Sequence, residues 1–335
     1  MKLFFSLFLS VFSAVSLLAE VNVLCTTAPV TLLAKAVIDG VGGYKVTTML
    51  PAAIGCPHDY ALTPQDMRKL AKADVIIING LGMEDFLDGA IPRVNRKALV
   101  VDSSKGVKGL LPFRDSEEEC SEHGHAHKHE HKHEHKHEHK HEHKHEHKHE
   151  HKHEHKHEHK HEHVWNEHLF AAPGTAAELV ARIAEELSLK FPKDSVKFSA
   201  NAKKYREALL KLDREYRAFG KTVPEGKRNI AVQHGIFDYL AAALGLHVTE
   251  YLQPHTGSEP SAAQIREMTA HLKRHGTSAI LVEKNYPSKV TDLVSRETKI
   301  PVLTLSVQPE SGATPEAFLK LHRDNLEVIK AFYEK

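Results

Sequence analysis

Two of the 29 histidines lie where parallel strands are predicted to end. His58 lies in the loop CPHDYAL, which follows the predicted strand YKVTTML, and His234 ends the predicted strand NIAVQH. In open parallel sheets, ligands bind beyond the carboxyl ends of the strands. Neutral imidazoles that converge from two such ends suit zinc. The joint placement of His58 and His234 therefore predicts a metal site that both residues share across a cleft.

A histidine repeat occupies the middle of the chain. Between His123 and His163 there are 21 histidines, and nine KHEH units run from Lys128 to His163. No apolar residue follows Ala126 within the tract, so it cannot bury a core, and residues 121–162 are predicted to be a disordered loop. Its Lys and Glu charges cancel, and its histidines make it cationic near about pH 5. An expression tag is disfavoured, because the tract is internal and interleaved with Lys and Glu.

The end of the repeat bears on a third ligand. In HKHEHVWNEH the repeat gives way at Val164 and Trp165, and Trp165 is the only tryptophan in the chain. Either His163 is the last repeat histidine, or it is a ligand held at the cleft where the chain returns to the fold. Because Val164 and Trp165 follow it directly, we favour the second alternative and expect Trp165 to anchor the returning chain. The other histidines are predicted to lie on the surface: His168, His247, His255, His271, His275 and His322.

Composition and the N-terminal segment restrict the partner class and the compartment. The formal net charge is +1, from 45 basic and 44 acidic residues, which indicates neither a nucleic-acid partner nor an acidic membrane surface. Residues 1–19 carry one early lysine, a short apolar run and a small residue at Ala19, a pattern typical of a cleaved signal peptide. No later stretch is long enough to span a membrane, and no lipobox-like pattern precedes Cys25. We therefore expect a soluble periplasmic protein.

Three cysteines are available in this oxidising compartment, namely Cys25, Cys56 and Cys120. Cys25 and Cys56 both lie just past predicted neighbouring strands. The alternatives are a Cys25–Cys56 disulfide and two free thiols, and both stay open.

Strands and helices alternate before the tract. Predicted strands cover residues 20–27, 44–50, 74–80 and 97–104, and predicted helices cover residues 28–40, 63–73 and 83–91. The helix at 63–73 has Thr63 as its N-cap, Pro64 at its first position and Asp66 three residues past the cap. The isoleucine-rich strand at 74–80 is apolar on both faces, as in a buried parallel strand. This alternation predicts a parallel α/β sheet.

One long predicted helix follows the tract, and a second α/β series follows that helix. Its predicted strands cover 229–235, 247–252, 278–284 and 301–307, and its helices are predicted to begin near Ile236, Ser261, Pro287 and Thr314. Apolar residues between Phe198 and Phe219 recur at steps of three, four and seven, which predicts one amphipathic helix about 40 Å long. The predicted fold class is therefore α/β, with two lobes of parallel sheet joined by one long helix and the metal site in the inter-lobe cleft.

The segment CPHDYALTPQDMRKLAKADVIIINGLGMEDFL resembles the first-lobe motif of the cluster A-I substrate-binding proteins of metal ABC transporters. In the zinc members of that family a His-rich loop comes next, then a His-Val-Trp ligand and the long helix. A strand that ends in histidine before an aromatic-rich helix (here QHGIFDYLAAALGL) and a Glu-Pro-Ser segment (here SEPSAAQI) follow. All of these occur in order, and the resemblance covers about residues 20 to 335. It implies that His58, His163 and His234 are the metal ligands.

The chain departs from the family pattern near its C-terminus. Many members close the site with an aspartate in a Leu-Asp-Pro-like segment, whereas this chain has TLSVQPESG, with Ser306 in the aspartate position. The fourth position is then water, Ser306, Gln308, Glu310 or a tract histidine. Some zinc members use a glutamate just before the first histidine, where this chain has Pro57. Loss of the carboxylate disfavours manganese, which prefers oxygen ligands.

The resemblance implies an extracytoplasmic receptor that captures Zn²⁺ and delivers it to the permease of an inner-membrane ABC transporter. Such a receptor is a monomer that docks peripherally and catalyses no reaction. A manganese, iron or nickel receptor is the alternative within the family. A zinc hydrolase is the alternative outside it, since three histidines and a water also form a catalytic pattern. The expected domains are a signal peptide (1–19), an N-terminal lobe (20–194), a linking helix (195–221) and a C-terminal lobe (222–335).

Overall fold

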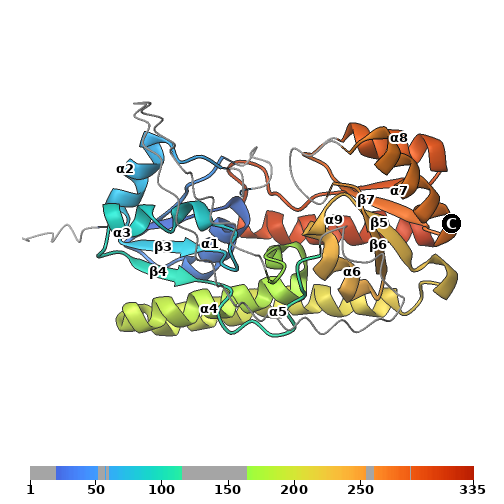
Figure 1. Ribbon diagram of the computed structural model, residues 1–335. Coiled ribbons are helices and arrows are strands. Elements are labelled where there is room, and N and C mark those ends of the chain that lie inside the picture. Colours follow the sequence, from blue (N-terminus) through green and yellow to red (C-terminus); the bar gives the residue numbers. More distant parts are fainter. Residues whose placement is uncertain (1–19, 52–56, 58–59, 115–163, 254–259, 287) are drawn as a thin grey trace, which may run out of the picture.

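Two sheets of parallel strands form the centres of the two lobes that Figure 1 shows. The computed structural model describes residues 20–51, 57, 60–114, 164–253, 260–286 and 288–335. The predicted signal peptide and the predicted His-rich loop lie outside these residues. The predicted fold class, α/β with two parallel sheets, is confirmed.

The first sheet has the strand order β2-β1-β3-β4. Its strands are β1 (Val21–Cys25), β2 (Tyr44–Thr48), β3 (Val75–Ile78) and β4 (Leu99–Asp102), and its helices are α1 (Ala28–Ile38), α2 (Pro64–Lys72) and α3 (Ala90–Val94). The predicted capping box begins α2, since the Thr63 hydroxyl accepts from the Asp66 N–H and the Asp66 carboxylate accepts from the Thr63 N–H. The single helix predicted at 83–91 is wrong. A 3₁₀ turn at Asp85–Leu87 precedes α3, and Gly89, a weak helix former, lies between them.

The second sheet repeats this topology with the order β6-β5-β7-β8. Its strands are β5 (Asn229–Val232), β6 (His247–Tyr251), β7 (Ala279–Glu283) and β8 (Val302–Leu305), and its helices are α6 (Asp238–Leu244), α7 (Ala262–Arg274), α8 (Lys289–Thr298) and α9 (Pro315–Tyr333). The hydroxyls of Ser261, Ser288 and Thr314 cap the last three of these helices. All four helices begin within two residues of their predicted starts.

The strand order places a topological switch point in each sheet, between β1 and β3 and between β5 and β7. Ligands of open α/β sheets bind beyond the carboxyl ends of the strands at such points. Asn79 follows β3 at the first switch point, and Gln233 and His234 follow β5 at the second. The fold therefore directs polar side chains from both lobes to the two places where a shared site is expected.

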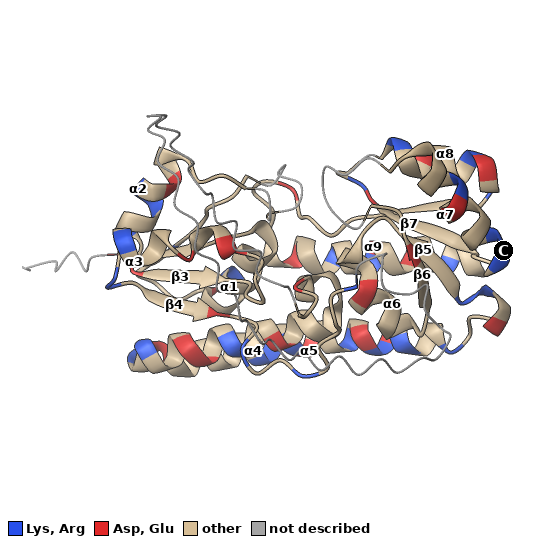
Figure 2. Ribbon diagram, in the orientation of Figure 1, with Lys and Arg blue, Asp and Glu red and all other residues tan. Residues whose placement is uncertain are grey.

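Two long helices lie side by side along the bottom of Figure 1, namely α4 (Pro173–Lys190) and α5 (Ser195–Gly220). The linking helix α5 is confirmed, and it buries the predicted face that includes Phe198, Leu209 and Tyr216. Helix α4 was not predicted from the sequence. Both basic and acidic residues occur along these two helices (Figure 2).

One apolar core connects the two lobes. It contains Val23 from β1, Val232 from β5 and residues of α1, α4, α5, α6 and α9. The opposite faces of the sheets pack in separate clusters, with Leu24 and Ile76 in the first lobe and Ala231 and Ile280 in the second. Because each sheet is covered on both faces, its central strands, such as β3 and β5, are largely buried, as parallel strands require. The exact domain boundaries stay predictions.

Candidate metal centre

The carboxyl end of β5 positions His234. The buried side chain of Gln233 donates to the Tyr286 carbonyl (2.8 Å) and accepts from the Glu283 N–H (3.1 Å). These two bonds join the ends of β5 and β7 at the switch point. The His234 imidazole is partly buried there, with its ring centre 6.1 Å from that of Tyr286. His234 therefore lies where the sequence predicts, at the end of a central strand.

The imidazole of His168 lies beside that of His234. The two ring centres are 5.5 Å apart and the ring planes meet at 80°. His168 is 3 % exposed, so the prediction of a surface position is wrong. The cause is tertiary, because the segment that carries His168 runs between the two lobes. His168 Nδ1 is 3.1 Å from Asn166 Oδ1 and 3.5 Å from Glu167 Oε1.

Asn166 determines how His168 is oriented. The Asn166 Nδ2 group donates to the Gly235 carbonyl (2.7 Å) and to Asp238 Oδ2 (2.9 Å), so its Oδ1 atom faces His168. That oxygen accepts from the His168 backbone N–H at 2.9 Å. The short contact between Oδ1 and His168 Nδ1 is then a hydrogen bond only if Nδ1 carries a proton. In neutral His168 the lone pair therefore lies on Nε2.

The segment that carries Asn166 and His168 is bound to both lobes. Asn79, at the end of β3, donates through Nδ2 to the Glu167 carbonyl at 2.8 Å. The Tyr239 hydroxyl of α6 donates to the Asn166 carbonyl at 2.7 Å. Asn166 and Glu167 are 0 % exposed. Buried hydrogen bonds to both lobes thus hold this segment in one arrangement.

The prediction that the Trp165 side chain anchors the returning chain is wrong, because Trp165 is 42 % exposed. Its backbone forms a bridge with Pro112, and the flanking bonds run from the Phe113 N–H to the Val164 carbonyl and from the Asn166 N–H to the Leu111 carbonyl. The chain is therefore held by backbone pairing and by the buried polar residues after Trp165. The polar run NEH at 166–168 was the available sequence signal, but without periodicity it does not indicate burial.

Two buried carboxyls border this network. Burial raises the pKa of Asp238 to about 6, while hydrogen bonds from Asn166 and from the Tyr251 hydroxyl act in the opposite direction. Burial also raises the pKa of Glu84 to about 7, although Glu84 accepts bonds from the Thr26 hydroxyl and from the Asn79 and Gly80 N–H groups. Glu84 thus holds the loop from which Asn79 reaches Glu167.

Two of the three predicted ligands, His58 and His163, lie outside the described residues, so their prediction stays untested. Within the described part of the chain, no three His, Cys, Asp or Glu side chains form a group that could hold a metal ion. Of the predicted ligands, the described residues include His234, and the His168 imidazole lies beside it. Ser306 is bound through its backbone to the Asn325 amide, at 2.9 and 2.6 Å.

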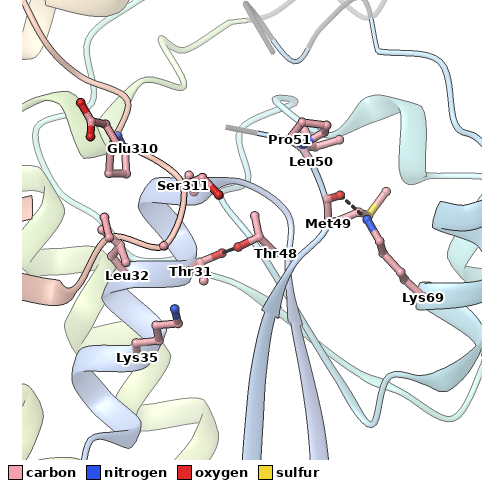
Figure 3. Close-up of a pocket in the computed structure, with 14 residues that line it drawn as sticks. Thr31, Leu32, Lys35, Thr48, Met49, Leu50, Pro51, Lys69, Glu310 and Ser311 are labelled. Carbon is pink, nitrogen blue, oxygen red and sulfur yellow. Dashed lines mark hydrogen bonds between the residues drawn. The ribbon is translucent and has the colours of Figure 1, made fainter. Parts of the chain in front are cut away.

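A cavity of about 260 Å³ lies between α1, the chain after β2 and the loop before α9 (Figure 3). The Thr31 and Thr48 hydroxyls are hydrogen-bonded at 2.9 Å within it, and the Lys69 ammonium donates to the Met49 carbonyl at 2.6 Å. Glu310, a candidate for the fourth ligand, lines this cavity together with Pro51. The described lining contains no imidazole, so these residues alone do not form a zinc site.

Of the other described histidines, some lie on the surface and one lies in the core. His247 and His275 are exposed as predicted, and His271 is partly buried beside Glu250 at 2.9 Å. His322 is fully buried against Phe318, so its predicted surface position is wrong. Burial lowers the pKa of His322 to about 4, which keeps this core imidazole neutral. His255 lies outside the described residues.

Cys25 is a buried free cysteine, and burial raises the pKa of its thiol to about 12. This agrees with the alternative of free thiols. Cys56, the other half of the possible disulfide, lies outside the described residues.

No helix in the described part of the chain is long and apolar enough to cross a membrane.

Residues 23–332 match the family model described as "ZnuA: Zinc-uptake complex component A periplasmic". The chain is 26 % identical over 321 residues to the zinc-binding protein AdcA of Streptococcus pyogenes serotype M3, covering 93 % of this chain and 56 % of that protein. The chain therefore spans little more than half the length of that relative.

Two further comparisons cover nearly whole chains. The high-affinity zinc uptake system protein ZnuA of Bacillus subtilis is 26 % identical over 316 residues, which are 93 % of this chain and 87 % of that protein. The substrate-binding protein FpvC of Pseudomonas aeruginosa, solved with Ni²⁺, has a TM-score of 0.72 at 21 % identity and covers 94 % of this chain and 97 % of its own. That likeness supports the two-lobed fold.

Proposed function

This chain belongs to the ZnuA family of periplasmic zinc-uptake components, and from that membership we propose that it captures Zn²⁺ and delivers it to an ABC permease. The observation that carries the proposal is the position of His234. It lies at the switch point of the second sheet, beside a buried polar segment that is bound to both lobes. A ligand held there contacts elements of both lobes, as capture by a two-lobed receptor requires.

The proposed ligands are His58, His163 and His234. Three neutral imidazoles favour zinc over manganese, because manganese prefers oxygen donors. The names of the AdcA and ZnuA relatives support the same metal. Water, Ser306, Gln308 and Glu310 remain candidates for the fourth position. Zn²⁺ is the transported ion in this proposal, so the site holds it without carrying out chemistry on it.

The proposed partner is an inner-membrane permease, on which the zinc-bound protein docks as a monomer. We place the mature protein in the periplasm after removal of residues 1–19. The family description, which names a periplasmic component, supports this location. Capture and delivery involve no bond making in a substrate, so the proposal includes no enzymatic activity.

Metal analysis of protein purified without added metal tests the proposal. We expect one tightly held zinc per chain when residues 123–161 are deleted, because the deletion removes the competing tract histidines. In that background His58→Ala and His234→Ala should each lose most of the affinity, and His275→Ala, at an exposed position, should lose none. Tight zinc binding that survives both ligand substitutions would contradict the proposed site.

A further inference from the structure

We infer that His271 and His275 form a second metal site, on the α7 side of the second lobe, for a divalent cation that favours imidazole, such as Zn²⁺. The two histidines lie one turn apart on α7, at positions i and i+4, and their ring centres are 4.2 Å apart. Side chains at this spacing lie on the same side of a helix. Two histidines so placed are a recurring way to bind zinc. No third His, Cys, Asp or Glu side chain among the described residues completes the group, so water fills the remaining positions.

The geometry of the pair allows a shared ion after a small movement. Zinc binds imidazole nitrogen at about 2.0–2.1 Å with tetrahedral angles, which places the centres of two coordinating rings about 5 Å apart. The two ring planes meet at 53°, far from the parallel planes of stacked rings. His275 is exposed, whereas His271 is partly buried. The His275 ring can therefore turn outward by the required distance while His271 stays in place.

The carboxylate of Glu250, on β6, prepares His271 as a ligand. Glu250 Oε2 is 2.9 Å from His271 Nδ1, and the Glu250 side chain is 14 % exposed. A lone pair on Nδ1 would face this negative charge, so the neutral ring carries its proton on Nδ1 and its lone pair on Nε2. Metal-binding histidines commonly have a carboxylate at their other nitrogen, which fixes the tautomer and raises the basicity of the ligand. Glu250 also adds a negative charge close to the cation.

The backbone that presents the pair is held in place. The His275 N–H donates to the His271 carbonyl at 3.0 Å, and the His275 carbonyl accepts from Asn229 Nδ2 at 2.7 Å. His275 is the C-cap of α7, and the C-terminal end of a helix carries a partial negative charge that favours cations. Only side-chain rotation is then needed for the two imidazoles to bind one ion.

This pair is separate from the proposed centre at His234. Asn229, which binds His275, is the first residue of β5, whereas His234 follows the last one. The Tyr251 hydroxyl bonds to Asp238 of α6, and Glu250, the preceding residue of the strand, points to the opposite face, where α7 packs. Figure 1 shows α7 in the lobe at the right. The pair therefore lies on another face of the second sheet, and near the other end of β5.

Modification of histidines by diethylpyrocarbonate in the full-length protein tests the inference. Peptide mass spectrometry measures the modification rate of each imidazole separately, and a metal buffer fixes the free Zn²⁺ concentration, so the tract histidines do not obscure the result. We expect micromolar Zn²⁺ to slow the modification of His271 and His275 with one common midpoint. At about ten times the midpoint concentration the rates should fall about tenfold. His247, exposed at the start of β6, is the matched control and should keep its rate.

Four variants show whether the two imidazoles act together. His271→Gln should abolish the effect of zinc on His275, and His275→Gln should abolish it on His271. Glu250→Gln should raise the midpoint by about 10–100-fold, the usual cost of losing a carboxylate that orients a ligand. His234→Ala should leave the midpoint unchanged, because its imidazole belongs to the other site.

Three results would overturn the inference. Zinc protection of His275 that survives His271→Gln would mean that the ion binds a single histidine. A His275 rate that does not respond to zinc would mean that the pair binds no metal. Loss of protection in His234→Ala would mean that the pair only responds to metal in the other site. His275→Gln changes an exposed side chain, so the reciprocal test on His271 remains available if His271→Gln fails to fold.

Discussion

The side-chain amide of Asn79 donates a hydrogen bond to the backbone carbonyl of Glu167, with 2.8 Å between the two atoms. Asn79 follows a central strand of the first sheet, and Glu167 lies beside the histidine that approaches His234 in the second lobe. Both residues are fully buried. This bond therefore connects the first sheet to the segment that approaches the candidate metal centre.

Asn79→Ala should weaken both the fold and zinc binding. The substitution leaves the buried Glu167 carbonyl without this donor, which costs about 1–3 kcal/mol of unfolding free energy. Urea denaturation of the metal-free protein measures this loss, and chelator competition measures the accompanying fall in zinc affinity. Asn22→Ala is the control, because the Asn22 side chain makes an exposed, long hydrogen bond to Asp74, at 3.5 Å. Equal stability of the two variants would mean that the bond from Asn79 does not hold the segment.

His163→Ala should lower the affinity of the tight zinc site far more than His145→Ala. The tract offers about twenty interchangeable histidines, so loss of His145 changes the local imidazole concentration very little. A proposed ligand next to the buried segment cannot be replaced with equal geometry. Calorimetry on both single variants, with and without residues 123–161, forms a cycle in which the cost of His163→Ala grows after the deletion. Equal and small effects would place the tight site elsewhere.

Glu84 should make stability depend on pH. Burial raises its folded-state pKa from 4.5 to about 7, so between these values the folded state binds a proton that the unfolded state has lost. The resulting stabilisation is fully present below about pH 4.5 and disappears as the pH rises through about 7, a change of about 3 kcal/mol. Glu84→Gln cannot titrate, so denaturation at several pH values should show the unsubstituted protein losing stability relative to this variant as the pH rises.

The control for Glu84 is Glu225→Gln, at a side chain that is 83 % exposed. It should change the unfolding free energy by less than about 0.5 kcal/mol at every pH in the series. A stability difference between Glu84→Gln and the unsubstituted protein that stays constant from acid to neutral pH would show that folding does not raise the pKa of Glu84.

Gly220→Ala should destabilise the contact between α5 and α6. A Cβ atom at Gly220 would lie 2.2 Å from the backbone carbonyl oxygen of Leu244, which cannot move away as a flexible side chain could. Overpacking of this kind costs about 1–3 kcal/mol. Thermal denaturation should therefore show a lower melting temperature for Gly220→Ala than for Gly226→Ala, where a Cβ atom meets nothing within 4 Å. Identical melting temperatures would indicate that the helix ends adjust freely.

Much of the fold could be predicted because local interactions decide it. The hydroxyls of caps such as Thr63 and Thr314 accept from N–H groups three residues further along the chain. The residues that start a helix are therefore recognisable in the sequence beside that helix. Apolar runs such as VIII at β3 indicate strands buried on both faces. The alternation of these elements restricts the topology to parallel sheets, and this placed His234 at the end of a central strand.

The tertiary structure alone decided which polar residues lie between the lobes. Asn166, Glu167 and His168 belong to a short segment without periodicity, and their burial depends on Asn79 and on residues 235–239, all more than 65 positions away in the chain. No local pattern distinguishes such a segment from an exposed loop. The sequence therefore predicts a surface position for His168 and an anchoring role for Trp165, and both predictions are wrong. The energy that buries these groups comes from hydrogen bonds that exist only after both lobes have folded.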